Sequence, residues 1–197
     1  LHVRSRRQRQ MCIRDRKDVT SWLINQKIEV IPPLISDFFM QGFVNLKVRQ
    51  NQHLQRKLTP DFVIDWLYKK VQKQINKVNE IGKNFNYFTP FESIFEKAEK
   101  AKQVISPGTQ FGEGWLISGE ILSFASQGVN HVISLQPFGC IANHIVEKGI
   151  EKRIKSLCPQ MNILSLDFDS SVSDVNITNR LLPVSYTHLR AHETRED

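Results

Sequence analysis

An alternation of strand-like and helix-like segments near the end of this chain constrains its fold more than any other feature. His131–Leu135 and Asn162–Leu166 are short apolar runs typical of buried strands. Between them, Ile145–Leu157 has the periodicity of an amphipathic helix, and Pro159 stops it. Two strands joined through a helix predict a parallel pair, because a parallel connection needs a crossover of about a dozen residues or more.

The upstream part of the chain predicts a third strand and a helix-rich insertion. Lys27–Ile31 is a β-branched run closed by Pro32–Pro33, so we expect a strand that ends at a loop. Further helices are expected over Leu34–Val48, from Thr59–Pro60 to near Gly82, from Thr89–Pro90 onward, over Trp115–Gln127 with Gly128 as its cap, and through Val175, Ile177 and Leu181. The predicted class is α/β: a Rossmann-like three-layer domain with a small parallel sheet and a helix-rich insertion.

The two ends of the chain do not share this patterning. LHVRSRRQRQMCIRDR (1–16) and VSYTHLRAHETRED (184–197) lack apolar periodicity and resemble translated sequencing adapters. We therefore interpret both ends as artefactual and disordered, and assign one domain to residues 17–183. The alternative is a natural basic arm that binds nucleic acid.

The net charge of +7 depends on these ends. Six of the 27 basic residues lie in the first string and two in the last, against one and three of the 20 acidic residues, so residues 17–183 carry a formal +3. A nucleic-acid partner then loses its main support. The chain also lacks an apolar run of the roughly 18 residues that indicate a membrane span. Neither nucleic acid nor membrane is expected as a partner.

Cys140 and Cys158 are the cysteines of the assigned domain. Two thiols without a signal peptide do not make a secreted disulfide framework, so a cytoplasmic, reducing location is expected. Cys140 ends the loop that follows the strand His131–Leu135, at the edge where open α/β sheets hold ligands and cofactors. This position suits a thiolate ligand of an iron–sulfur cluster. In general, however, a single cysteine is more often a small buried apolar residue.

Three blocks of the sequence resemble one family. GEGWLISGEI (112–121), SLQPFGCIANHIVEKGIEKRIK (134–155) and LDFDSSVSDVNITNRL (166–181) look like consecutive blocks of the acyl-CoA dehydratase activase-related proteins, in a region similar to the subunits of 2-hydroxyacyl-CoA dehydratases. IEVIPPLISDF (28–38) looks like an upstream element of the same region. The PFGC–NH and NRL segments are the specific ones.

This resemblance implies a role for Cys140. In that family an actin-like ATPase module drives ATP-dependent electron transfer, and cysteines from different domains hold a [4Fe–4S] cluster in the dehydratase subunits. The resemblance implies that Cys140 is one such ligand, that the other ligands and the ATPase module belong to a longer parent, and that an acyl-CoA is the substrate. The chain has no GxxxxGK[ST] motif. Two interpretations stay open: a redox module, or a non-catalytic structural or interaction domain with the same fold.

Further polar residues could contribute to such a site. Asn143 and His144 could contact the cluster or a thioester substrate, or they could satisfy backbone groups of the turn. Glu113 is another candidate, although a carboxylate at a helix N-terminus is already favourable through the helix dipole. Asp167–Asp169 should lie along the same sheet edge as Cys140, because a parallel strand ends there too. Together with Asn176, these aspartates are either a metal site or, more simply, a solvated turn followed by the cap of a helix.

Overall fold

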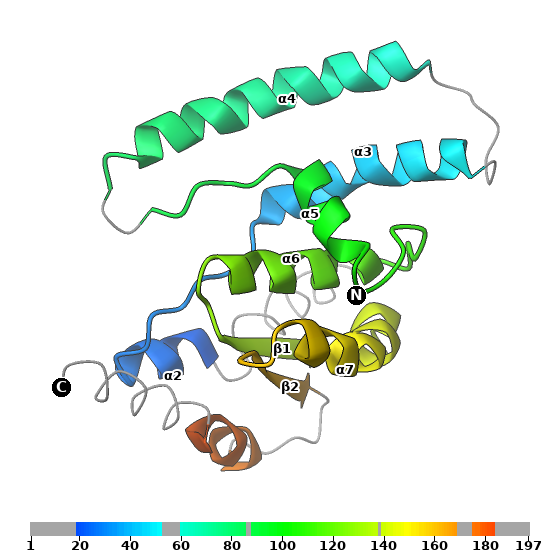
Figure 1. Cartoon of the computed structure of the whole chain (residues 1–197). Helices are drawn as coiled ribbons and strands as arrows, with labels where there is room; N and C mark the ends of the chain where they lie inside the picture. The colour runs from blue at the N-terminus through cyan, green and yellow to red at the C-terminus, as the bar shows by residue number, and fades with distance from the viewer. Residues whose placement is uncertain (1–18, 53–59, 86–87, 138, 169–174, 184–197) are drawn as a thin grey trace, which may run out of the picture. The chain divides into compact units, whose positions relative to one another are not determined.

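The computed structural model describes residues 19–52, 60–85, 88–137, 139–168 and 175–183 (Figure 1). The expectations for residues 1–16, 184–197, Thr59 and Asp169 lie outside these ranges. The chain divides into two compact units. The α/β unit comprises the described residues up to Pro32 and from Gln127 onward, and the helical unit is Pro33–Ser126. In sequence, the helical unit is therefore an insertion within the α/β unit.

The α/β unit is built on a parallel pair of strands, β1 (His131–Pro137) and β2 (Asn162–Phe168), paired in register along their whole length. The crossover between them is helical. It starts as a π-helix, η1 (Ala142–Glu147), and continues as α7 (Lys148–Leu157). The predicted parallel pair and its helical connection are confirmed, and the helix begins earlier than Ile145. The α/β class is confirmed with them.

The two faces of this sheet differ in character because successive side chains of a strand point to opposite sides. One face packs on an apolar cluster that includes α2 (Val19–Asn25) and the helical residues 175–183. The cluster is formed by Val19, Leu23, Ile133, Leu135, Leu164, Leu166, Phe168, Ile177 and Leu181. The predicted last helix is thus confirmed over its described residues. The opposite face is polar towards the carboxyl ends of the strands.

The expected strand Lys27–Ile31 is wrong: the sheet that the described residues form has two strands. The reason lies at the end of α2. Lys27 adopts a φ of 62°, its N–H donates to Ile24 O at 2.9 Å, and the Ile28 N–H donates to Leu23 O at 3.1 Å. These are the two bonds of a Schellman motif. Ile28 and Val30 pack on the apolar cluster instead, so the β-branched pattern indicated burial and not strand pairing.

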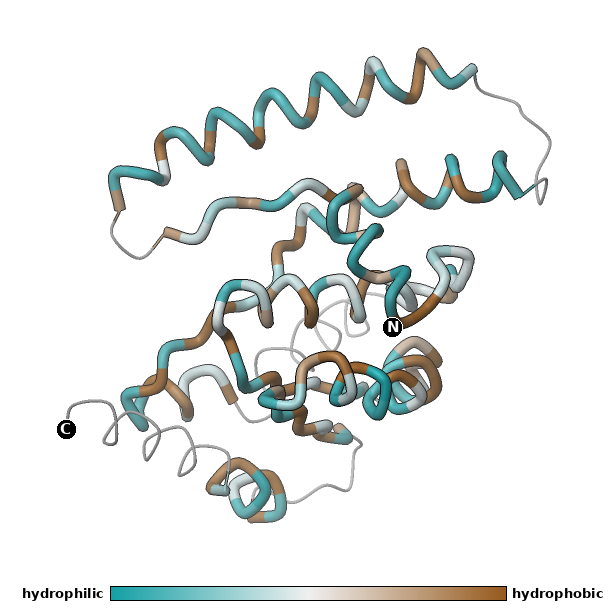
Figure 2. Tube along the Cα trace, in the orientation of Figure 1, coloured by the Kyte–Doolittle hydropathy of each residue, from teal (hydrophilic) through white to brown (hydrophobic). Residues whose placement is uncertain are grey.

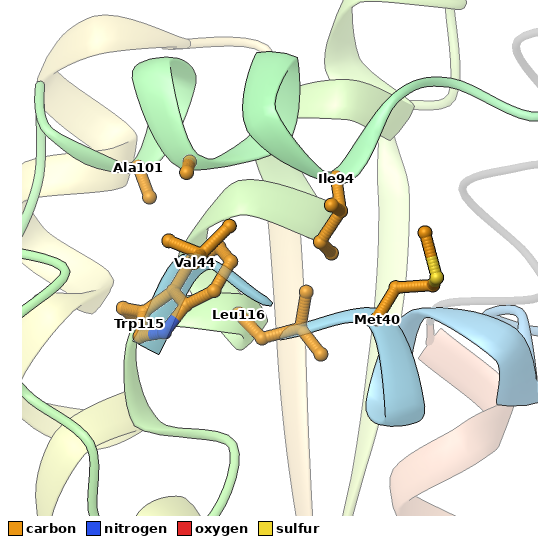
Figure 3. Packing of buried hydrophobic residues seen from close by; sticks show 7 residues of the cluster. Met40, Val44, Ile94, Ala101, Trp115 and Leu116 are labelled. Carbon is orange, nitrogen blue, oxygen red and sulfur yellow. The ribbon is translucent and has the colours of Figure 1, made fainter. Parts of the chain in front are cut away.

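The helical unit contains α3 (Ile35–Asn51), α4 (Asp61–Gly82), α5 (Ile94–Ala101) and α6 (Gly114–Ser126). Its core lies where α3, α5 and α6 meet (Figure 3). The core residues are Met40, Val44, Ile94, Ala98, Ala101, Trp115 and Leu116. Trp115 is fully buried, and its Nε1–H donates to Asn45 Oδ1 at 2.7 Å. The indole therefore satisfies its one polar group inside the core.

The start of α5 differs from the expectation of a helix opened by Thr89–Pro90. Ser93 is the N-cap: its Oγ accepts from the Phe95 N–H, and the Glu96 carboxylate accepts from the Ser93 N–H, which makes a capping box. The preceding segment is held on α4 by Asn79, whose side chain accepts from the Phe91 N–H and donates to Phe91 O. Gly128 has a φ of 85° just after α6, as expected for its cap.

Gly119 allows α5 and α6 to approach closely. A Cβ at this position would lie 2.7 Å from Lys97 O, a backbone atom that cannot move alone. We expect Gly119→Ala to destabilise the helical unit by about 1–3 kcal/mol in urea unfolding, as overpacking does. Gly42→Ala is the matched control, because a Cβ there meets nothing within 4 Å. It should stabilise α3 by roughly 0.5–1 kcal/mol, and equal effects of the two changes would contradict the close approach.

Candidate functional site

Cys140 lies where β1 turns into the crossover helix. Its N–H donates to Pro137 O at 3.1 Å, and its carbonyl accepts from the His144 N–H at 3.0 Å as the helix begins. Gly139 has a φ of 79°, which lets the chain turn between the strand and the helix. The thiol of Cys140 is free and partly exposed. The structure therefore places Cys140 at the carboxyl end of a parallel strand, as the sequence predicts.

Asn143 holds the thiol. Cys140 Sγ donates to Asn143 Oδ1 at 3.3 Å, and Asn143 Nδ2 donates to Leu135 O at 3.0 Å. Both ends of the Asn143 amide are thus hydrogen-bonded, the oxygen to the Cys140 thiol and the nitrogen to the backbone carbonyl of Leu135 in β1. Asn143 contacts the candidate ligand directly and also satisfies a backbone group, so both readings of its sequence position have support.

His144 connects Cys140 with the end of β2. Its Nδ1 lies 3.1 Å from Cys140 O, and its Nε2 lies 3.4 Å from Asp167 Oδ1. Lys148 Nζ lies 3.2 Å from the same carboxylate oxygen. Asp167 therefore lies along the same edge as Cys140, as expected. Within the described ranges, no group of three or more histidine, cysteine or carboxylate side chains is arranged to hold a metal ion.

A buried carboxylate, which the sequence does not single out, lies behind this edge. Glu147, the last residue of η1, is 2% exposed. Its Oε2 accepts from Ser134 Oγ and, at 3.2 Å, from Gln136 Nε2, and its Oε1 accepts from Ser165 Oγ at 3.3 Å. Gln136 Nε2 also lies 3.5 Å from Asn143 O. The network therefore reaches the residue that holds the thiol.

One signal in the sequence could have found this network. Ser134 and Gln136 alternate with apolar residues in the first strand, and Ser165 has the same place in the second. Residues two apart share a face of a strand, and the register sets Ser134 opposite Ser165. Polar residues on one face of two buried strands call for a polar partner on the covering helix. Glu147 is that partner.

Glu113 does not belong to this group. It precedes α6 in the helical unit, where its carbonyl accepts from the Ile117 N–H and burial raises the pKa of its carboxyl group. Burial raises the pKa of Glu120, about two helical turns away, from 4.5 to about 7. The charge of Lys97 opposes this rise, and the charges of Asp37 and Glu113 add to it. Glu113 is thus part of a second titratable cluster, in the other unit.

Cys158 cannot bind the same metal centre as Cys140. It follows α7 directly, at the opposite end of the continuous helix that begins after Cys140. About 17 helical residues separate the two thiols, which corresponds to roughly 25 Å along the axis. Among the described residues, the α/β unit therefore offers one thiolate at the edge of its sheet, supported by Asn143 and His144.

Comparison of the chain with models of protein families, with curated proteins and with solved structures finds no match in any of the three. Over the described residues, no helix combines the length and the apolar character needed to cross a membrane.

Proposed function

We propose that this chain is the C-terminal, dehydratase-subunit-like part of an acyl-CoA dehydratase activase-related protein, and that Cys140 supplies one thiolate to a [4Fe–4S] cluster. The observation that carries the proposal is the position of Cys140: a free, partly exposed thiol at the carboxyl end of a parallel strand. The sequence blocks that surround it supply the family.

The residues present can supply one of the ligands of such a cluster. A [4Fe–4S] cluster is generally held by four cysteine thiolates, and the edge of the sheet offers Cys140 alone among the described residues. To bind iron, its Sγ would give up its proton and its bond to Asn143 Oδ1. When bound, the cluster would supply one-electron chemistry. The part played by this chain is to hold the thiol on a rigid strand end, and the other ligands would come from the rest of the parent.

The same proposal extends to the architecture and the partners. The two described strands would belong to a larger Rossmann-like sheet in three layers, with η1 and α7 on one face and α2 on the other. An ATPase activase module elsewhere in the parent would deliver the electron, an acyl-CoA would be the substrate, and the protein would be cytoplasmic.

A second candidate is a non-catalytic structural or interaction domain that keeps this fold. One observation favours it: large apolar side chains are exposed on α3 and α4, where apolar residues recur at each turn (Figure 2). The most exposed include Ile35, Phe39, Phe62, Trp66 and Ile81. Extended apolar surface of this kind is typical of contacts between proteins or domains.

Iron retention separates the two candidates. In the parent protein, purified without oxygen, Cys140→Ala should weaken cluster retention by more than about tenfold, because even the loss of an outer partner of a metal ligand has that effect. Iron and sulfide per chain and the visible absorbance of the cluster are the measurements. Cys158→Ala is the matched control and should change neither.

Unaltered iron in the Cys140→Ala protein would reject the ligand role and leave the interaction domain as the better candidate. The chain alone should hydrolyse no ATP, since it has no GxxxxGK[ST] phosphate-binding loop. It should also dehydrate no 2-hydroxyacyl-CoA, since a single thiolate does not complete the cluster site.

A further inference from the structure

Glu147 is a buried carboxylate whose partners among the described residues are all neutral. Among the described residues it accepts hydrogen bonds from two serines and one glutamine, and it forms no ion pair. Burial of a charged group is costly unless hydrogen bonds compensate it. A leucine or methionine in its place would leave the side chains of Ser134, Gln136 and Ser165 without this acceptor. The carboxylate and its three donors therefore form one network.

The partners of Glu147 come from both strands. Ser134 and Gln136 belong to β1, and Ser165 belongs to β2. One side chain thereby fastens η1 to the two strands of the sheet. η1 is π-helical, a geometry that is rare and is found frequently at functional sites. Its first residue follows Cys140 by two positions, so the attachment of η1 fixes where the thiol can lie.

Hydrogen bonds connect the carboxylate with the thiol through Gln136 and then through the backbone and side chain of Asn143. The side-chain nitrogen of Gln136 carries two hydrogens, and it lies within reach of two acceptors, Glu147 Oε2 and Asn143 O. The carboxylate thus sets the orientation of the Gln136 amide, and the amide holds the backbone of Asn143. The Asn143 side chain in turn accepts from Cys140 Sγ.

We infer that Glu147 is a positioning residue for Cys140: acting through Gln136 and Asn143, it holds the thiol in one orientation at the carboxyl edge of the sheet. This inference deepens the proposed function. It rests on the proposed function only for the identity of the group that the thiol binds. The orientation of the thiol itself can be tested without any cluster.

Alkylation of the two cysteines by iodoacetamide is the test, in the full 197-residue chain carrying Cys12→Ser. Glu147→Met removes the acceptor of Ser134 and Gln136 while it keeps the length of the side chain. Cys140 should then react about fivefold faster, the factor that corresponds to one lost hydrogen bond of ordinary net strength. Cys158, quantified in the same sample by peptide mass, should keep its rate.

Two further variants separate positioning from bulk and charge. Glu147→Gln should restore the wild-type rate at Cys140, because its carbonyl can accept from Ser134 and Gln136 while its NH₂ donates to Ser165 Oγ. Glu151→Met is the matched control: Glu151 lies one turn further along the helix and pairs with Lys155 at 2.7 Å on the surface. It should leave both cysteines unchanged.

A rate at Cys140 that stays at the wild-type value in Glu147→Met, or an equal rise at both cysteines, would overturn the inference. If Glu147→Met does not fold, Asn143→Ala tests the last link, and it should produce the same selective rise. Iron retention in the parent tests the ligand role of Cys140 separately from the positioning role of Glu147. A selective rise at Cys140 beside a Cys140→Ala parent that keeps its iron supports positioning and rejects the ligand role.

Discussion

Lys97→Met is expected to destabilise the helical unit by about 3–5 kcal/mol, the cost of removing one partner of a buried ion pair. Lys97 Nζ donates to Asp37 Oδ2, and the two side chains are 8% and 5% exposed. They come from α5 and α3, so the pair joins two helices of the core. Without the ammonium, the Asp37 carboxylate stays buried with no cation beside it. The variant also loses the positive charge that lowers the pKa of Glu120.

Urea unfolding followed by tryptophan fluorescence, to which the buried Trp115 contributes, measures this loss. Lys102→Met is the matched control, because it breaks an ion pair with Glu99 whose side chains are 54% and 69% exposed. Surface pairs of this kind contribute about 0–1 kcal/mol. The double variant Asp37→Leu, Lys97→Met should recover part of the loss, since it leaves no unpaired charge. A cost of Lys97→Met no larger than that of Lys102→Met would contradict the role of the buried pair.

Glu120→Gln is expected to stabilise the helical unit above neutral pH by up to about 3 kcal/mol, and to have little effect near pH 4.5. Burial raises the pKa of Glu120 from 4.5 to about 7, and each pKa unit corresponds to about 1.4 kcal/mol. Between these two pH values the folded state binds more protons than the unfolded state. Stability therefore falls as pH rises from about 4.5 to about 7, and is level above that range. Glutamine stays neutral and does not incur this loss.

The comparison needs urea unfolding of both proteins at several pH values between 4.5 and 8.5. Glu80→Gln is the control, because Glu80 is an exposed carboxylate of α4 in the same unit. Its profile should run parallel to that of the wild-type chain. If the curve of Glu120→Gln also runs parallel to the wild type, the group that titrates near neutral pH is another one, and Glu113, whose pKa burial also raises, is the next to test.

The position of Cys140 could be predicted because it depends on local rules. A short apolar run ends, proline and glycine turn the chain, and a parallel strand brings its last residue to the edge of the sheet. Asp167 follows from the same rule, since β2 runs parallel to β1 in register. The prediction of a strand at Lys27–Ile31 was wrong. A β-branched pattern indicates burial, and it does so both for a strand and for a segment that packs on the core without pairing.

The buried Asp37–Lys97 pair and the network around Glu147 could not be predicted in full, for a different reason. Asp37 and Lys97 are 60 residues apart in sequence, and each is unremarkable in its own helix. Their pairing depends on how α3 and α5 pack. Glu147 meets Ser165 where the crossover helix packs on the sheet, and this helix begins earlier than expected, as a π-helix. Such encounters depend on packing between elements, which the order of residues alone does not specify.

The insertion of the helical unit has a consequence for the order in which the chain assembles on the ribosome. α2 is synthesised before the insertion, but its apolar residues Val19 and Leu23 pack with Leu166, Ile177 and Leu181. The whole of Pro33–Ser126 is synthesised between these partners. The insertion can fold on contacts within itself as it emerges, whereas α2 must wait until Leu181 has been synthesised. Until then its apolar face is open to chaperones and to other nascent chains.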